Sequence, residues 1–394
     1  MEKQVVIAGA CRTPVGKMGG LLSRFPAARL GSIVISEALR RAQVPAEQVD
    51  QVLMGCVLQA AQGQNIARQA ALGAGLPAAV PAQTLNTVCG SGLESVNLAA
   101  ALIRSGEADI MVAGGMESMS SAPFALEKAR FGYRMNNGVL VDTMVHDALW
   151  DAMNDYHMGI TAENLAEKYG ITREKQDEFA VASQRKCEEA RKSGRFHSEI
   201  VPVSVSVQKE IRLIDFDESP RDNVTSAQLA RLRPAFKENG TVTAGNSSGI
   251  NDGAAAVVVM SAEKASELGV KPQASYLGGA IAGVEPAFMG IGPVASTRKL
   301  LKRMGRTVRS FDLIEANEAF AAQSLAVGME LGWDSSLVNV NGGAIAIGHP
   351  VGASGCRILV TLIQELLRRG ASLGLATLCV GGGMGVSAAV SAIR

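Results

Sequence analysis

The sequence has few residues of the kinds that hold metals, disulfides or nucleotides. Its six cysteines form no Cys-x-x-Cys pair, and its four histidines show no His-Glu-x-x-His spacing. There is no P-loop, and Gly90-Ser91-Gly92 is only a partial dinucleotide fingerprint, because Ser95 stands where glycine or alanine is required. A chain of this size needs no disulfide staples. We therefore expect reduced thiols, a cytoplasmic location and no metal site.

Net charge and aromatic side chains are also scarce. The formal net charge is +1 and aromatic residues make up 4% of the chain, so no nucleic-acid partner is predicted. One uncharged run, residues 371–393, is long enough to suggest a membrane span. Gly381-Gly382-Gly383 interrupts it, and we expect two buried strands at 373–379 and 384–390 instead. The first residues pass straight into an expected strand, so we predict no signal peptide and no membrane partner.

Glycine is abundant, with 43 residues, and small apolar residues surround it. Short apolar segments that end in glycine alternate with amphipathic segments, which indicates an α/β fold with a helix-covered parallel sheet. The length predicts about two to three domains. The alternation lapses between about 120 and 246 and resumes after Gly245, where the later segments include an expected strand at 337–340. We expect an inserted subdomain there, with one helix at 161–169 capped by Thr161 and a longer one at 173–192.

The two ends of the chain carry similar patterns. A glycine-rich turn, Cys89-Gly90-Ser91-Gly92 or Gly352-Ala353-Ser354-Gly355, precedes a helix, and a later strand meets Gly114-Gly115-Met116 or Gly382-Gly383-Met384. A chain rich in glycine and alanine can produce such echoes by chance. We nevertheless expect a duplicated α/β unit, with halves at residues 1–270 and 271–394 and the insertion in the first half.

Cys89 lies at an expected strand-to-helix turn. Unpaired N–H groups and the positive end of the helix dipole favour a thiolate there, which would make Cys89 a nucleophile at neutral pH. Gly90 and Gly92 would let a substrate approach the sulfur. The alternative is a buried cysteine that acts as a small apolar side chain, as free cysteines usually do.

Three further candidates lie in the second half. His349 stands in a glycine-lined turn, where its ring has few packing neighbours, and Pro350 suits the first position of a helix. Cys379 ends a strand before a glycine-rich turn, although a core cysteine is the alternative. Asn317 sits at another strand-to-helix junction and could be an ordinary N-cap.

Taken together, four motifs resemble a known family. Cys89-Gly90-Ser91-Gly92, Asn317-Glu318-Ala319-Phe320, Gly348-His349-Pro350 and Cys379-Val380-Gly381-Gly382-Gly383 resemble the signatures of the thiolases, most closely the acetyl-CoA acetyltransferases. The resemblance runs essentially from end to end. It implies duplicated βαβαβαββ halves in a layered α/β/α/β/α sandwich with an inserted loop domain. It also implies reversible Claisen condensation of two acetyl-CoA molecules to acetoacetyl-CoA and CoA.

The resemblance assigns a role to each candidate. Cys89 would carry the acyl group, His349 would deprotonate it, and Cys379 would exchange the α-proton of the second acetyl-CoA. One oxyanion hole would use the N–H groups of Cys89 and Gly381, and the other would use His349 with a water held by Asn317. No permanently bound cofactor is implied, and coenzyme A and acetyl-CoA are substrates.

The same resemblance points to a set of substrate contacts, for which core or surface roles remain the alternative. Residues of two groups align with the coenzyme A site and with the pantetheine tunnel and acyl pocket: Leu149, His157, Met158, Arg221 and Phe236, and then Ala244, Ser248, Met289, Phe320 and His349. Gln228 departs from the smaller residue expected, which puts the adenosine contacts in question.

Three questions of function remain open at this point. Met289 resembles the bulky residue of short-chain enzymes, which favours acetoacetyl-CoA as substrate. The alternatives are a broad-range degradative 3-oxoacyl-CoA thiolase and a non-catalytic acyl-CoA carrier on the same scaffold. The resemblance also implies a homotetramer, or else a homodimer.

Overall fold

The computed structural model describes residues 3–207 and 210–393 and contains one large twisted sheet. Its strands follow the order β14-β15-β16-β13-β1-β12-β5-β3-β4, and the short β2 (Gly16–Lys17) pairs with β12. The strands of the first half are β1 (Val5–Arg12), β3 (Gln51–Gly55), β4 (Ala82–Leu85), β5 (Ile110–Ser118) and β12 (Asn251–Ser261). Those of the second half are β13 (Ala274–Gly283), β14 (Leu313–Ala316), β15 (Leu373–Val380) and β16 (Met384–Ala392).

The two halves of the sheet repeat one topology. In the first half β3 pairs in parallel with β4 and β5, and β12 pairs antiparallel with both β5 and β1. In the second half β14 pairs in parallel with β15 and, through a bridge from Ile314, with Val338. There β16 pairs antiparallel with both β15 and β13. The order and directions match, with the bridge at Val338 in the place that β4 takes in the first half, so the duplication is confirmed.

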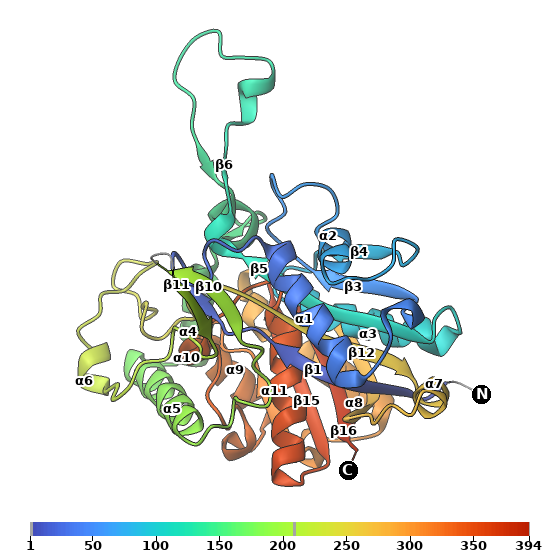
Figure 1. Cartoon of the computed structure of the whole chain (residues 1–394). Coiled ribbons are helices and arrows are strands. Elements are labelled where there is room, and N and C mark those ends of the chain that lie inside the picture. The colour runs from blue at the N-terminus through green and yellow to red at the C-terminus, as the bar shows by residue number, and fades with distance from the viewer. Residues whose placement is uncertain (1–2, 208–209, 394) are drawn as a thin grey trace.

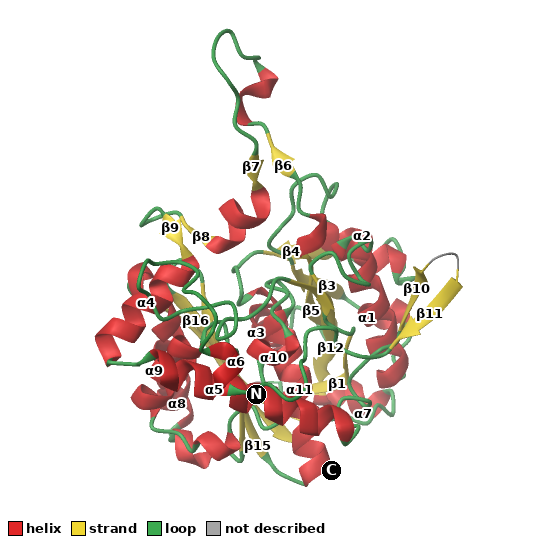
Figure 2. Cartoon of the chain, turned by 90° about the vertical axis from the view of Figure 1, so that its left-hand side faces the viewer, coloured by secondary structure: helices red, strands yellow, loops and turns green. Residues whose placement is uncertain are grey.

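Helices and half-sheets alternate in five layers (Figures 1 and 2). Helices α1 (Ala27–Ala42) and α2 (Ile66–Gly73) cover the outer face of the first half-sheet, while α3 (Ser91–Ser105) and α11 (Ser354–Arg369) lie between the half-sheets. Helix α8 (Gly292–Met304) covers the outer face of the second half-sheet. The predicted layered sandwich is therefore confirmed. The elements that complete the halves are α7 (Ala262–Glu267), α9 (Ala321–Leu331) and α10 (Ala344–Ile347).

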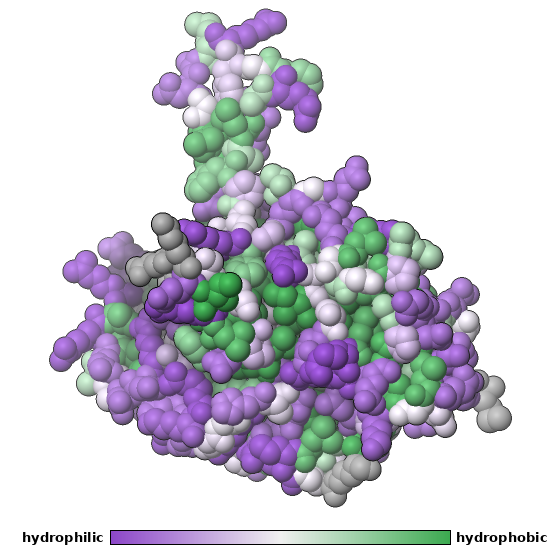
Figure 3. Space-filling view, in the orientation of Figure 1, coloured by the Kyte–Doolittle hydropathy of each residue, from purple (hydrophilic) through white to green (hydrophobic). Residues whose placement is uncertain are grey.

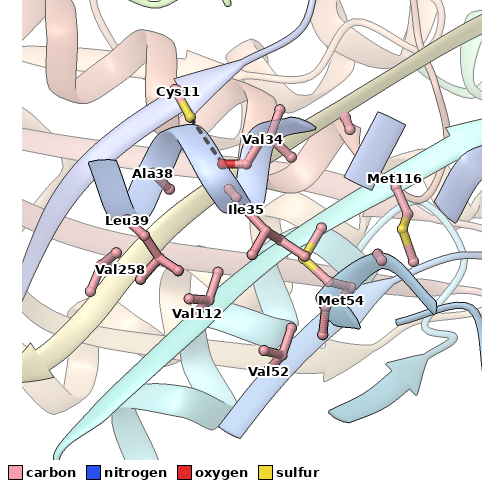
Figure 4. Close-up of a cluster of buried hydrophobic side chains, with 14 of the residues drawn as sticks. Cys11, Val34, Ile35, Ala38, Leu39, Val52, Met54, Val112, Met116 and Val258 are labelled. Carbon is pink, nitrogen blue, oxygen red and sulfur yellow. Dashed lines mark hydrogen bonds between the residues drawn. The ribbon is translucent and has the colours of Figure 1, made fainter. Parts of the chain in front are cut away.

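Apolar packing between these layers is continuous. Figure 4 shows Ile35 and Leu39 of α1 directed at Val52, Val112 and Val258 of three neighbouring strands. All five side chains are buried, so each contributes about 1.5–3 kcal/mol of hydrophobic stabilisation. This outer core holds the first half-sheet rigid behind the ends of β3, β4 and β5, where the candidate site lies.

The insertion follows β5 and includes an arm that projects from the body (Figure 1). Strands β6 (Phe124–Ala125) and β7 (Val141–Asp142) form the stem of the arm, and a π-helix (Val145–Leu149) and a second ribbon, β8 (Trp150–Asp151) with β9 (Tyr156–His157), follow it. Then come α4 (Met158–Tyr169), α5 (Arg173–Lys192), the hairpin β10 (Val203–Val207) and β11 (Glu210–Ile214), and α6 (Ser226–Leu229). The long helix at 173–192 was predicted with its bounds.

Three local predictions are wrong. Helix α4 begins at Met158, so Thr161 lies inside its first turn, and the cap is His157, whose Nδ1 accepts the Gly159 N–H at 3.0 Å. The strand expected at 337–340 is a 3-10 turn (Ser335–Leu337) followed by the single bridge at Val338. Pro350 is not the first residue of a helix, since α11 begins at Ser354. Within the described ranges, no helix is long and apolar enough to cross a membrane.

Candidate active site

Cys89 lies in a tight turn between β4 and α3. The preceding residue, Val88, has a φ of 41°, a left-handed conformation that is rare for a β-branched side chain. Ser91 holds the turn, because its hydroxyl accepts the Thr87 N–H at 2.8 Å and donates to the Val88 carbonyl at 2.6 Å. Asn86 Oδ1 accepts the Val88 N–H at 3.0 Å. The sulfur is therefore presented from a strained turn that is fixed on both sides.

The half-buried sulfur of Cys89 faces two backbone N–H groups. It accepts hydrogen bonds from the N–H of Gly381 and from its own N–H, and both lower the pKa of the thiol. Burial opposes them and is the larger effect, so the pKa of Cys89 is raised to about 11. The expectation of a resting thiolate is thus wrong, because loss of water around the sulfur outweighs the turn and the helix dipole.

Cys379 is fully buried near the end of β15 and lies close enough to Cys89 for the two sulfurs to interact. Burial raises the pKa of the Cys379 thiol well above its usual range, and the charge that Cys89 would carry raises it further. Gly382 and Gly383, both at φ 83°, form the turn that leads to β16. This turn brings the backbone of Gly381 to Cys89, so the structure places two thiols and one backbone N–H together.

His349 lies between α10 and α11 with its ring almost completely buried. Asn251 Oδ1 accepts its backbone N–H at 2.9 Å, and Ser354 Oγ is 2.5 Å from Nδ1. The same hydroxyl is 2.8 Å from the Pro350 carbonyl. One hydroxyl proton can serve only one of these contacts, so both are hydrogen bonds only if Nδ1 carries the ring proton. Nε2 is then the free basic nitrogen.

The imidazole is neutral at rest. Burial lowers the pKa of His349 to about 4, and the positive charge of the buried Arg357 contributes to the same shift. At rest, Cys89 is therefore a neutral thiol and His349 is a neutral base, and the two are not a thiolate and an imidazolium. Transfer of the thiol proton is unfavourable until the sulfur begins to form a bond.

Asn317 follows β14 and is buried against the His349 ring. Its Nδ2 is 3.5 Å from both ring nitrogens, so it is directed at neither lone pair. Its Oδ1 is buried and has no hydrogen-bond partner among the described residues. Asn317 is not an N-cap, because α9 begins at Ala321 and Phe320 occupies the cap position. An unpaired amide oxygen beside the imidazole is the kind of group that orients a water or a substrate.

The residues predicted to contact the substrate fall into connected groups. Met158, Met289 and Phe320 are buried in one apolar cluster with Cys379. Phe236 packs on this cluster, stacks on His157 at 4.5 Å between ring centroids, and meets Phe320 edge-on at 6.1 Å.

A second group lies beside the first. Arg221 and Ala244 line a cavity of about 170 Å³, whose wall also includes Ser247, and Ser247 forms a backbone bridge to Phe320. The Ser248 N–H bonds the Ala319 carbonyl at 2.9 Å, which puts Ser248 at the same junction. Leu149 lies apart from these residues, in the cluster that contacts Cys89. Gln228 takes part in the cap of α6 with Thr225.

Sequence reasoning missed three polar residues that hold the site. Asn251 and Ser354 bind His349, and Glu117 accepts the Gly352 N–H at 2.9 Å. The only signal in the sequence was position: Ser354 lies in the glycine-rich turn after His349, and Glu117 follows Gly114-Gly115-Met116. Over the described ranges, no cluster of three or more His, Cys, Asp or Glu side chains is placed to hold a metal ion.

Comparison with known proteins gives a consistent result over the full length. The family descriptions "Thiolase, N-terminal domain" and "Thiolase, C-terminal domain" match residues 5–263 and 270–392. The chain is 58% identical to an acetyl-CoA acetyltransferase of Pseudomonas aeruginosa and 59% identical to one of Cupriavidus necator, in both cases over 98% of each chain. A crystal structure of the Bacillus anthracis acetyl-CoA acetyltransferase superposes with a TM-score of 0.97 at 45% identity, covering 100% of this chain and 99% of that one.

The raised pKa of Cys89 predicts how fast the thiol reacts with iodoacetamide at different pH values. Because the thiol is protonated below about pH 11, its thiolate fraction should rise about tenfold for each pH unit between 7 and 10. The rate of modification at Cys89, followed by peptide mass spectrometry, should rise in proportion. The other five cysteines are buried and serve as internal controls. A plateau that begins near pH 8 would contradict the assignment.

Proposed function

The chain belongs to the thiolase family, and on that premise we propose that it is an acetyl-CoA C-acetyltransferase. It condenses two acetyl-CoA molecules to acetoacetyl-CoA and CoA, or runs the reverse thiolysis, through an acyl-cysteine. The observation that supports this most is that the Cys89 sulfur accepts a hydrogen bond from the Gly381 N–H and lies beside Cys379. A non-catalytic carrier would have no use for two thiols in one crevice.

In the first half of the proposed cycle, Cys89 becomes acylated. Its sulfur attacks the thioester carbonyl while its proton moves to Nε2 of His349, and the N–H groups of Cys89 and Gly381 stabilise the oxyanion. Collapse of the tetrahedral intermediate breaks the bond to CoA, whose sulfur takes the proton of Cys379. The site then holds acetyl-Cys89, protonated His349 and a Cys379 thiolate.

In the second half, the carbon–carbon bond forms. The Cys379 thiolate removes the α-proton of the second acetyl-CoA, and the enolate oxygen is stabilised by the His349 Nε2–H and a water on Asn317. The carbanion attacks acetyl-Cys89. Expulsion of the Cys89 thiolate, which recovers its proton from His349, releases acetoacetyl-CoA. All three groups end neutral, as they are at rest.

The acyl pocket favours a short chain. Met289 is 4% exposed and packs with Met158 and Phe320, so its side chain fills space that a longer acyl chain would need. We propose that Arg221 and the cavity it lines receive the coenzyme A, together with Leu149, His157, Phe236, Ala244 and Ser248. The alternative, a broad-range degradative 3-oxoacyl-CoA thiolase, requires a pocket that Met289 does not close.

The arm supports assembly into a homotetramer. Phe131, Met135 and Val139 are 93%, 84% and 74% exposed, and Figure 3 shows apolar surface along the stem of the arm. So many exposed apolar side chains on one narrow projection indicate a protein contact. A second copy is the proposed occupant, because homo-oligomers are the commonest assemblies and the arm extends far beyond its own subunit.

Three further assignments complete the proposal. The boundary between the halves lies near residue 270, between α7 and the start of β13 at Ala274. The enzyme works in the cytoplasm, where the six free cysteines stay reduced. Its reaction belongs to acyl-CoA and fatty acid metabolism.

The acyl-enzyme can be trapped. With radiolabelled acetyl-CoA, we expect the label on Cys89 in the parent protein and no label in Cys89→Ala, because the thiol is the acceptor. In Cys379→Ala the acetyl group should accumulate on Cys89 without acetoacetyl-CoA forming. Peptide mass spectrometry and product analysis measure both results. Label on another residue, or condensation by Cys89→Ala, would refute the mechanism.

Shortening Met289 should widen the range of acyl chains. In Met289→Ala, kcat/KM for 3-oxohexanoyl-CoA relative to acetoacetyl-CoA should rise by about tenfold or more, the usual worth of a methylene in an apolar pocket. Thiolysis rates across chain lengths measure this. The control is Met111→Ala, which removes a buried methionine from the layer between the half-sheets. It should lower the free energy of unfolding and leave the chain-length preference unchanged. An unchanged dependence of the thiolysis rate on acyl chain length would contradict the assignment of Met289 to the acyl pocket.

Removing apolar side chains from the arm should reduce the size of the assembly. The triple change of Phe131, Met135 and Val139 to serine is expected to yield dimers or monomers by light scattering. Ile211 and Leu213 on β11 are 81% and 61% exposed, and their change to serine is the matched control, which should keep the parent mass. A tetramer that survives the triple change would reject the proposed contact.

A further inference from the structure

Glu117 is a buried carboxylate on β5 that the mechanism above does not use. Its side chain lies where the two halves meet, and it is fully buried. Oε2 accepts the N–H of Val57 at 3.0 Å and of Gly352 at 2.9 Å. Oε1 accepts the N–H of Leu58 at 3.1 Å and the thiol of Cys56 at 3.5 Å. The two oxygens thus collect donors from segments that are far apart in sequence.

The N–H groups that Glu117 accepts belong to segments on both sides of the active site. Val57 and Leu58 follow β3 and belong to the apolar cluster that contacts Cys89. Gly352 follows the segment that carries His349, and Val351 of that segment packs in the same cluster. A single carboxylate therefore joins the wall beside the nucleophile to the backbone that carries the base.

Gly352 has no side chain of its own to hold the chain at this point, although the neighbouring Val351 packs in the apolar cluster. A Cβ at Gly352 would lie 2.7 Å from Glu117 Oε2. Asn251 fixes the backbone at His349 itself, and Glu318 fixes Ile345 upstream with an N–H bond of 3.2 Å. Glu117 supplies the corresponding bond on the downstream side, between His349 and α11.

We propose that Glu117 is a positioning residue for acyl transfer, which holds the His349 segment against residues 56–58 so that the imidazole stays within reach of the Cys89 thiol. This inference rests on the proposed acetyltransferase activity. A misplacement of about 1 Å between reacting groups can cost about 100-fold in rate, which sets the size of the expected effect.

The ionisation of Glu117 provides an independent readout. Burial raises the pKa of Glu117 to about 7, although its N–H partners lower it. Protonation below that pH converts an acceptor oxygen into a donor that faces N–H groups, which weakens the contact. The titratable groups around it are the thiols of Cys56 and Cys89, both with raised pKa values, and His349 with a pKa of about 4. None of these three groups titrates between pH 5 and 8. Burial raises the pKa of Glu315, two residues before Asn317, to about 8, so the acid limb is assigned to Glu117 by its loss in Glu117→Gln.

The test compares Glu117→Gln and Glu117→Ala with the parent, with rates expressed per Cys89 that accepts labelled acetyl. Glu117→Gln can keep its amide oxygen on Val57 and Gly352, so kcat should fall by about tenfold and its acid limb near pH 7 should vanish. Glu117→Ala loses both bonds and should lose about 100-fold in kcat. KM for acetyl-CoA should change by no more than about twofold in either variant, since neither removes a substrate contact.

The matched control is Glu163→Gln. Glu163 is also buried and accepts the N–H groups of Thr241 and Val242 at 2.8 Å, yet it touches neither residues 56–58 nor the His349 segment. It should lower stability and leave kcat per site and its acid limb unchanged. A folded Glu117→Ala with kcat within about twofold of the parent would overturn the proposal.

If Glu117→Ala does not fold, Glu117→Gln decides, and an acid limb that it retains would overturn the proposal. Failure of the parent to acetylate Cys89 would instead reject the proposed function.

Discussion

The site depends on a close approach of two backbones. The carbonyl of Gly352, from the second half, lies against Gly55, Gly92 and Gly115 of the first half. A Cβ at these three positions would come within 2.8, 2.9 and 2.0 Å of that oxygen. No other residue type fits such contacts without moving the chain. No side chain separates the halves here. The segments that carry Cys89 and His349 therefore pack backbone against backbone.

This approach also explains the electrostatics of the site. Backbone and apolar side chains pack closely around the site, and burial is the largest influence on the pKa of the Cys89 and Cys379 thiols and of the His349 imidazole. Each group is held in its neutral form. In the proposed reaction, charge develops only when the carbonyl is attacked, and a fixed N–H donor such as that of Gly381 would receive it without reorganisation. In that proposal, the burial that makes the resting thiol a poor nucleophile also strengthens the hydrogen bonds to the oxyanion.

The sequence was sufficient for the features that glycine marks. The turns around Cys89, His349 and Cys379, the repeated halves and the insertion all follow from where glycine interrupts apolar segments. It was insufficient wherever a distant segment decides. The strand expected at 337–340 is a turn with one bridge, because only Val338 reaches β14. The protonation of Cys89 depends on burial by both halves, and the partners of Glu117 come from residues 56–58 and 352, which no local pattern connects.

The strain at Val88 shows that both halves are needed to hold the turn that carries Cys89. A β-branched residue at positive φ costs about 1–3 kcal/mol, and it persists only where its surroundings fix it. The first half supplies Ser91 and Asn86, which bind the backbone of the turn. The second half closes over Gly90, where a Cβ would lie 2.9 Å from Val380 and 2.7 Å from Val386. These side chains belong to the strands that flank Gly381, so the contact that stabilises the strained turn also brings the Gly381 N–H to the sulfur. The strained turn and the hydrogen bond to the sulfur are thus two results of one packing arrangement.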